Sequence, residues 1–485
     1  MRRSALSALL FLAACGGRSD RPPEPKAAPR PLAPRPAARA PAPPVAAPPL
    51  APAAGAPLAP AELRAFAGTL DALTLQIFRR LPDGENVAIA GPVVASALGL
   101  AAPGAREATR REFERVLPLA QGDARFHEVL GGLLAARTDR CLLSAANAAF
   151  VEETLQLEPA WVDAMAGARA QLVPVAFSRD PEKARGRING WAREATRGAI
   201  DELVPRGVID PLTRLALVSA ASFTADWAQP FSRSATVRGA FHLASGETIE
   251  VPKLAATERL RFARTEGVRL VELPYACAGF SMVLLASDTG DDHERGSGPG
   301  GRGRRGEPAA QRMPLDAIEE ALTPERLAGW IGAAREGIVS LRLPRFRVES
   351  AVELKPVLAR AGLRRAMSPT ADYGRIANVP LQVQAVPHRT FVEVNEQGTR
   401  AGAAAAVILG SRGAPPIAAS FDFDRPFLFL IREKASGLLL FVGRVAQPHD
   451  PGDPEPIEAP AEPVRRQGFS RQAVDLYREM HLPPE

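Results

Sequence analysis

Residue types that catalyse reactions or bind metals occur in this sequence, but not at catalytic or metal-binding spacings. The six histidines and three cysteines form no C-x-x-C or H-E-x-x-H group. No G-x-S-x-G occurs that would present a serine nucleophile. A G-x-G-x-x-G is present at Gly301, Gly303 and Gly306, but it lies in a Gly/Arg-rich run with no strand before it. The sequence therefore predicts neither an enzyme, nor a metal site, nor a cofactor.

The stretch from Asn395 to Gly413, NEQGTRAGAAAAVILGSRG, has a different kind of chemistry. Small and apolar residues lead to Arg412, whereas a catalytic site would concentrate polar, titratable side chains. Side chains alternate in an extended chain, so one face carries a hydroxyl and three methyl groups: Thr399, Ala401, Ala403 and Ala405. A charge on this face would cost several kcal/mol if the face were buried.

Helical periodicity dominates the first half of the chain and strand patterns dominate the second. Apolar spacing predicts a helix over residues 61–81 and another within 181–203 that stops near Gly198. Strands are predicted within 337–349, 390–396, 426–433 and 437–445, the last two joined by a turn at 434–437. This arrangement predicts an α+β fold in one large domain.

The composition favours a globular protein without a dedicated nucleic-acid surface. The 485 residues are 46% hydrophobic and 24% charged, with a net charge of +6. Acidic and basic residues are intermixed, as at 106–117, which is typical of solvated helix faces. We therefore expect no nucleic-acid partner.

The N-terminus predicts export and lipid anchoring. Residues 1–15 have two arginines, an apolar run and small residues before Cys15, and Leu12–Cys15 resembles the lipobox of bacterial lipoproteins. Lipidation of Cys15 would anchor the chain to the cell envelope, facing the periplasm or the cell surface. Gly16 in place of aspartate favours the outer membrane. The other interpretation is an ordinary cleaved signal peptide with an incidental cysteine.

Three segments are predicted to lie outside the core. Residues 16–61 are a Pro/Ala-rich disordered linker, 288–312 a Gly/Arg-rich insertion, and 449–485 a largely disordered C-terminal extension. The domain proper spans 62–448. A large domain does not need a disulfide, so we interpret Cys141 and Cys277 as buried thiols, although an oxidising compartment would allow them to pair.

The stretch from Asn395, together with DRPFLFLIRE and FVGRVAQP, resembles the reactive-centre loop and C-terminal strands of serpins. The segment NGWAREATRGAIDELVPRGVIDPLTRLALVSAASFTADWAQPF also resembles the family, with family residues at Asn189, Trp191, Thr196 and Gly198 and the breach tryptophan at Trp227. The resemblance implies a serpin fold: helices packed on a large mixed central sheet plus smaller sheets, with an exposed reactive-centre loop.

The resemblance also implies an inhibitory mechanism and its residues. Arg345 would pair with Glu396 at the base of the loop, and Glu396, Gly398 and the small-residue face would form the hinge. Counting from Glu396, the seventeenth residue is Arg412, so the reactive bond would be Arg412–Gly413, with Leu409 or Ser411 as alternatives. A monomer would act as suicide substrate for a trypsin-like serine protease, whose pocket carboxylate suits Arg412. After cleavage the hinge would insert into the central sheet as a new strand and trap the acyl-enzyme. A cysteine protease target and a non-inhibitory surface protein are the alternatives.

The sequence departs from the serpin pattern in the shutter region. Gly91 and Val94 stand where the family usually has two serines, and Ser219 replaces an asparagine. His388 is present, eight residues before Glu396, and two roles stay open for it: a shutter residue, or a buried histidine satisfied by backbone or by Ser219. Gly402 adds flexibility to the hinge.

Overall fold

The structure is a computed structural model that describes residues 58–134, 137–138, 141–277, 279–288, 312–399 and 416–452. Several predicted features lie outside these residues: the lipobox with Cys15, most of the linker, most of the 288–312 insertion, and the chain after residue 452. The hinge and loop residues Ala401, Ala403, Ala405, Arg412 and Gly413 lie outside them as well.

Helices form where apolar residues recur at helical spacing. The first helix buries Phe66, Leu70, Leu73 and Ile77 along one stripe. The α-helices are α1 Pro60–Phe78, α2 Gly91–Ala101, α3 Glu107–Val116, α4 Asp123–Leu133, α5 Pro159–Gly167, α6 Pro181–Ala195, α7 Leu315–Ala321, α8 Pro324–Gly332 and α9 Lys355–Arg360. Short 3-10 turns lie at Ala102–Gly104 and Arg233–Ala235. Among the described helices, none combines the length and the hydropathy needed to cross a bilayer.

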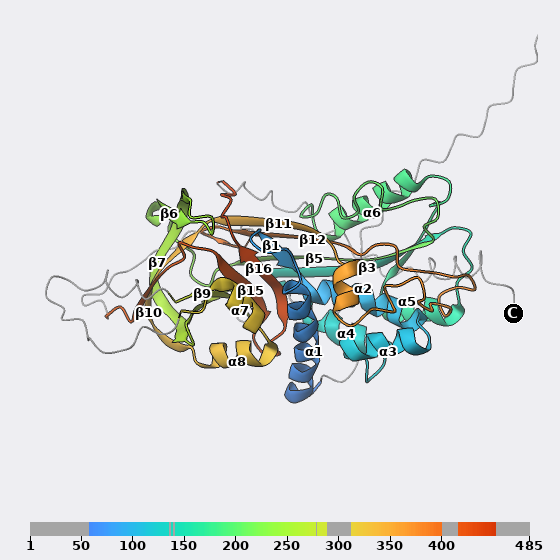
Figure 1. The fold of residues 1–485 in the computed structure, drawn as a ribbon, viewed down its shortest axis with the longest axis horizontal. Helices are drawn as coiled ribbons and strands as arrows, with labels where there is room; N and C mark the ends of the chain where they lie inside the picture. Colours follow the sequence, from blue (N-terminus) through green and yellow to red (C-terminus); the bar gives the residue numbers. More distant parts are fainter. Residues whose placement is uncertain are drawn as a thin grey trace, which may run out of the picture. The chain divides into compact units, whose positions relative to one another are not determined.

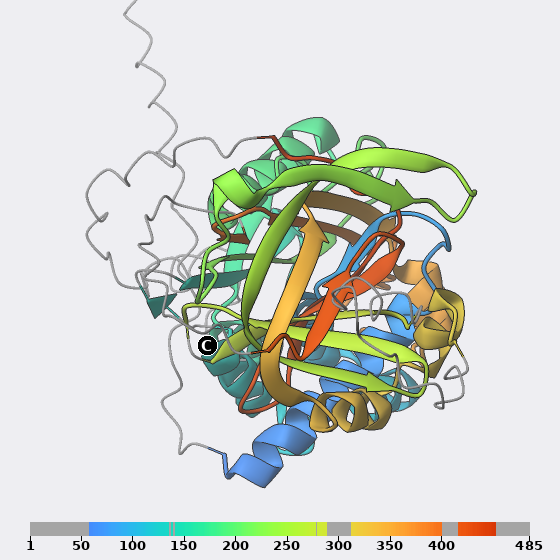
Figure 2. The ribbon, with the colours of Figure 1, turned by 90° about the vertical axis from the view of Figure 1, so that its left-hand side faces the viewer.

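One sheet has nine strands in the described part of the chain. They are β1 Val87–Ile89, β6 Val237–His242, β7 Thr248–Thr265, β8 Val268–Pro274, β9 Phe280–Ser287, β10 Arg335–Pro344, β14 Ala419–Asp422, β15 Phe427–Glu433 and β16 Leu439–Val445. Their order is β1-β16-β15-β9-β8-β7-β10-β14, with β6 beside β7. Figure 2 shows the long green β7 beside β10. Strands β15 and β16 are interior and fully apolar at their centres, as their sequences predict.

The second sheet has seven strands within the described ranges. They are β2 Arg137–Thr138, β3 Cys141–Glu152, β4 Gln171–Val175, β5 Leu215–Asp226, β11 Phe346–Glu353, β12 Pro387–Val394 and β13 Gly398–Thr399. The order is β11-β12-β13-β5-β3-β2, with β4 parallel to β3. Figure 1 shows α6 on one face of this sheet and α2 on the other.

The middle of the seven-stranded sheet is incomplete. The two-residue strand β13 is antiparallel to both β12 and β5, which are therefore parallel to each other. Among the described residues, β5 and β12 are joined by β13 at one end and have no ladder of their own beyond it. The sheet thus contains two internal strand edges that face each other.

The predicted α+β class and the helices packed on mixed sheets are confirmed. The stretch 337–349, predicted as one strand, is divided at Arg345 between β10 and β11, which belong to different sheets, and the strand predicted within 390–396 ends at Val394. The interpretation of Cys277 as a buried free thiol is wrong, because Cys277 is buried but disulfide-bonded. Composition alone could not reveal this, since a bond requires proximity of two sulfurs, which only the fold sets. Cys141 lies in β3, and its side chain is outside the described part of the structure.

Candidate functional site

A tight turn after β12 directs the chain into β13. Asn395 Oδ1 accepts the backbone N–H groups of Gln397, at 3.1 Å, and Gly398, at 3.3 Å, in the manner of an Asx-turn. Trp227 donates its backbone N–H to the Gln397 carbonyl at 2.8 Å and its indole N–H to the Asn395 carbonyl at 3.0 Å. A Cβ on residue 398 would lie 2.0 Å from the carbonyl oxygen of Ala225, so only glycine fits there.

Thr399 faces the protein core. Its side chain is 2% exposed, and its Oγ1 lies 2.7 Å from the hydroxyl of Tyr275, which is itself stacked on Trp227 with ring centroids 4.7 Å apart. Burial raises the pKa of the Tyr275 phenol far above its usual range, so Tyr275 stays a neutral hydrogen-bonding group. Thr399 therefore lies on the core-facing side of β13.

Arg345 and Glu396 form a buried ion pair beside this turn. Arg345 Nε donates to Glu396 Oε1 at 2.9 Å, and Thr236 Oγ1 donates to the same oxygen at 2.7 Å. The side chain of Glu396 is 1% exposed and that of Arg345 is 10% exposed. Phe231 donates its backbone N–H to the Glu396 carbonyl at 2.7 Å. Main chain and side chain of Glu396 are thus both fixed, which anchors the start of the loop.

A polar cluster joins α2 to the central strands β3 and β5. The sequence analysis missed two of its members, Ser96 and Asn147. Asn147 Oδ1 on β3 accepts hydrogen bonds from Ser219 Oγ of β5, at 2.7 Å, and from Ser96 Oγ of α2, at 2.9 Å. Asn147 and Ser219 are register partners. The available signal was Asn147 itself, an amide in an otherwise small and apolar stretch, AANAAF.

The residues predicted to form the shutter contact different partners in the structure. Gly91 packs so closely on Thr74 that a Cβ would lie 1.7 Å from Thr74 Oγ1. His388 Nε2 accepts the backbone N–H of Ala90 at 3.1 Å, whereas the Ser219 hydroxyl is directed to Asn147. Burial lowers the pKa of His388 from 6.5 to about 4, so the ring is neutral at pH 7.

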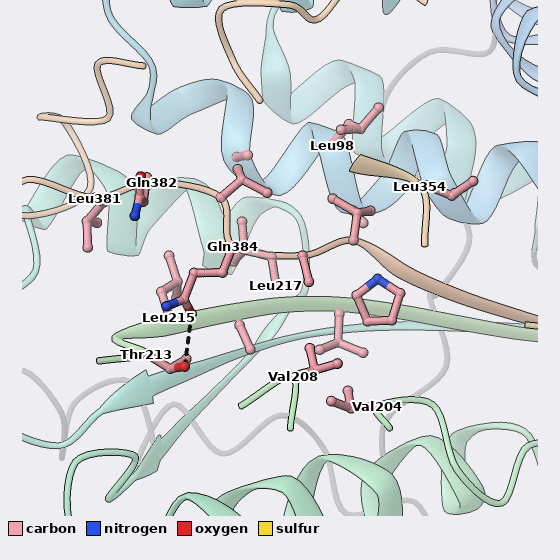
Figure 3. Close-up of a pocket in the computed structure, with 18 of the residues that line it drawn as sticks. Leu98, Val204, Val208, Thr213, Leu215, Leu217, Leu354, Leu381, Gln382 and Gln384 are labelled. Carbon is pink, nitrogen blue, oxygen red and sulfur yellow. Dashed lines mark hydrogen bonds between the residues drawn. The ribbon is translucent and has the colours of Figure 1, made fainter. Parts of the chain in front are cut away.

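A cavity of about 290 Å³ lies at the far end of the gap between β5 and the segment that leads into β12. Figure 3 shows Leu98 of α2 above the strands and Val204 and Val208, which follow α6, below them. Leu215 and Leu217 of β5 also line it. Its lining is largely apolar, and two of its polar lining residues are joined by a hydrogen bond of 2.9 Å from Thr213 Oγ1 to Gln384 Oε1. No group of three metal-ligating side chains occurs in the described residues.

Comparison with known proteins finds consistent similarities. The model of the family described as "Serpin (serine protease inhibitor)" matches residues 69–295 and 308–448. Serpin-Z7 of Hordeum vulgare is 32% identical over 380 residues, covering 75% of this chain and 90% of that protein. Serpin B8 of Homo sapiens is 32% identical over 393 residues, covering 79% and 98%. The solved structure of a cleaved Serpin 42Da aligns with a TM-score of 0.66 and 26% identity, covering 81% of this chain and all of that one.

The buried His388 predicts a pH-dependent stability. Between about pH 6.5 and 4 the unfolded chain binds a proton at this residue that the folded chain excludes, so stability falls as pH falls through that window, by about 3 kcal/mol in total. His388→Gln keeps an acceptor for Ala90 and removes this contribution. Its urea midpoint should therefore change less between pH 7 and pH 4 than that of the wild type.

The matched control is His242→Gln, at a side chain that is 44% exposed. It reports what a histidine-to-glutamine change does to the urea midpoint where no buried imidazole is removed. Equal slopes for His388→Gln and the wild type would show that His388 is not the titrating group.

Proposed function

Because the chain belongs to the serpin family of serine protease inhibitors, we propose that it traps trypsin-like serine proteases, which cleave this chain at the Arg412–Gly413 bond. One observation carries the proposal: β13 already pairs with β5 through Gly398 and Thr399 and with β12 through Thr399, while among the described residues β5 and β12 have no ladder beyond it. The loop that follows thus starts inside the sheet in the orientation that further insertion needs.

The register of β13 indicates where an inserted loop would lie. Thr399 faces Ala225 on β5 and Val394 on β12. If pairing continues without a bulge, Ala405, six residues on, faces Ser219 and His388, six residues back on each strand. The same alternation directs Val407 and Leu409 to the core side, at the level of β5 residues Leu217 and Leu215, which line the cavity. These apolar side chains match an apolar cavity.

The face that would be buried is small throughout the first half of the insertion. Ala401, Ala403 and Ala405 add only methyl groups, and Arg400 belongs to the opposite face. Insertion would give the facing edges of β5 and β12 backbone hydrogen-bond partners at little steric cost. This favours an inhibitor over a non-inhibitory relative, in which bulky or charged hinge residues would oppose entry.

Trapping depends on a covalent step made by the protease. Its serine attacks the Arg412 carbonyl, the bond to Gly413 breaks, and the new amino terminus leaves while the acyl bond to Arg412 forms. Residues 400–412 of the released segment would add up to ~43 Å of strand at ~3.3 Å per residue and carry the protease along. Inhibition requires the loop to insert faster than the acyl-enzyme is hydrolysed.

The first test is incubation with trypsin followed by denaturing electrophoresis. The wild type should give a band at the summed mass that survives boiling, and Arg412→Ala should abolish it because the specificity pocket loses its ligand. Cleavage after Arg412 with full residual trypsin activity would contradict inhibition and favour the non-inhibitory alternative. Complexes formed with arginine-directed cysteine proteases but not with trypsin would favour that second class of target.

A charge on the buried face should convert the inhibitor into a substrate. Ala401→Arg places a cation on the face that would be buried only on insertion, so insertion should slow and the ratio of cleaved product to covalent complex should rise at least about tenfold. Arg400→Glu, a charge change on the adjacent residue and opposite face, is the control and should leave complex formation within about twofold. Equal partitioning in both variants would refute face-specific insertion.

The same proposal includes an anchored location at the bacterial outer membrane through lipidated Cys15. The lipobox resemblance at Leu12–Cys15 and the Pro/Ala-rich spacer that follows support it. Cys15→Ala should move the protein from the membrane fraction to the soluble fraction of an expressing bacterium and abolish fatty-acid labelling. Labelling that persists in Cys15→Ala, or wild type in the soluble fraction, would refute the anchor.

A further inference from the structure

After β16 the chain remains on the surface of the domain. It lies beside the breach, the region around Trp227, Arg345 and Glu396 at the start of β13. Asn86, the residue before β1, accepts the backbone N–H groups of Ala446, at 2.7 Å, and Gln447, at 2.9 Å, through Oδ1. Its Nδ2 donates to the Gln447 carbonyl at 2.6 Å and lies 3.0 Å from His449 Nδ1. Asn86 therefore uses both ends of its amide to fix this segment.

The next residues run along the start of β11. Arg347 donates its backbone N–H to the His449 carbonyl at 2.9 Å. Asp450 Oδ1 accepts the N–H of Gly452 at 3.0 Å, in a turn that Gly452 completes with a φ of 79°. The family match ends at residue 448, so His449–Gly452 is an addition to the matched domain.

This turn brings Asp450 to the breach arginine. Asp450 Oδ1 lies 3.9 Å from Arg345 Nη1, while Nε of the same guanidinium donates to Glu396. Glu396 is 1% exposed and Asp450 is 41% exposed, so the guanidinium has a carboxylate on its buried side and another on its solvent side. A planar guanidinium approached from two edges has less freedom to rotate.

We propose that Asp450 is a positioning residue for the breach: it holds Arg345 in the orientation that binds Glu396, and so slows the opening of the sheet. The consequence for protease trapping rests on the proposed function, but the positioning itself does not. Asn86 then fixes the segment Ala446–Gly452 to the domain, and Asp450 of this segment holds the Arg345 guanidinium.

The most direct test is amide hydrogen exchange at Trp227 and Phe231, whose N–H groups bind the Gln397 and Glu396 carbonyls. Asp450→Asn should exchange about two- to fourfold faster at both amides, the range expected for loss of an exposed ion pair. Asn86→Ala should act in the same direction, and Asp450→Glu should restore protection. The half-time of trypsin inhibition during incubation at 45 °C should shorten by the same factor.

Salt and a matched control separate charge from mere packing. At 1 M NaCl the exposed ion pair of Asp450 with Arg345 is screened, so the amide exchange rates of the wild type should approach those of Asp450→Asn. The rates of Asp450→Asn itself should change little with salt. Glu153→Gln removes a carboxylate of similar exposure, 40%, that pairs with Arg179 elsewhere. It should leave exchange at Trp227 and Phe231 unchanged.

The outcomes distinguish this inference from the proposed function. Exchange in Asp450→Asn and Asn86→Ala equal to that in Glu153→Gln would overturn the positioning role, whether or not trypsin is trapped. Faster exchange in a protein that traps no protease would support the positioning role and refute the proposed function. If Asp450→Asn exchanges faster but the wild type in 1 M NaCl does not, the effect comes from packing, and the role of the Asp450 charge is overturned.

Discussion

The structure depends on an unfinished sheet, closed at one end by two residues. Strands β5 and β12 run parallel, and Gly398–Thr399 is the strand that pairs with both in the described residues. Backbone groups along a strand edge are strong donors and acceptors, so an open pair of edges inside a sheet favours entry of a further strand. The surrounding contacts control how readily that entry occurs.

Those contacts combine rigid packing with a buried charge. The stack of Trp227 on Tyr275 supports Thr399 from the core side, and Arg345 and Thr236 hold the side chain of Glu396. A buried ion pair is costly to break, because the partner left behind is a desolvated charge. The breach therefore tolerates few substitutions, whereas the alanine-rich segment that would enter the gap demands only small side chains on one face.

Sequence patterns predicted the elements whose periodicity is strong and the residues whose roles are local. The helix Pro60–Phe78 and the strands β15 and β16 follow from apolar spacing. The central strands β3 and β5 are rich in Ala and Ser, which have weak strand preference, so tertiary pairing decides their conformation. Ser96 and Asn147 meet only through strand register and helix packing, which periodicity does not encode. The Cys277 disulfide was missed for the same reason, because proximity is a property of the fold.

Covalent connectivity limits how far an intact loop could insert between β5 and β12. Insertion of residues 400–412 would carry Arg412 ~43 Å from Thr399 at ~3.3 Å per residue, and the six residues before Ala419 span at most ~20 Å. Ala419 begins β14, whose Asp422 bonds Lys253 at 2.5 Å, next to Pro252, which accepts the N–H of Arg345. Strand β14 is thus fixed at the breach end of the molecule, too far for those six residues to reach. Full insertion requires either loss of β14 from β10 or cleavage of the loop, and cleavage breaks one peptide bond while leaving both sheets intact.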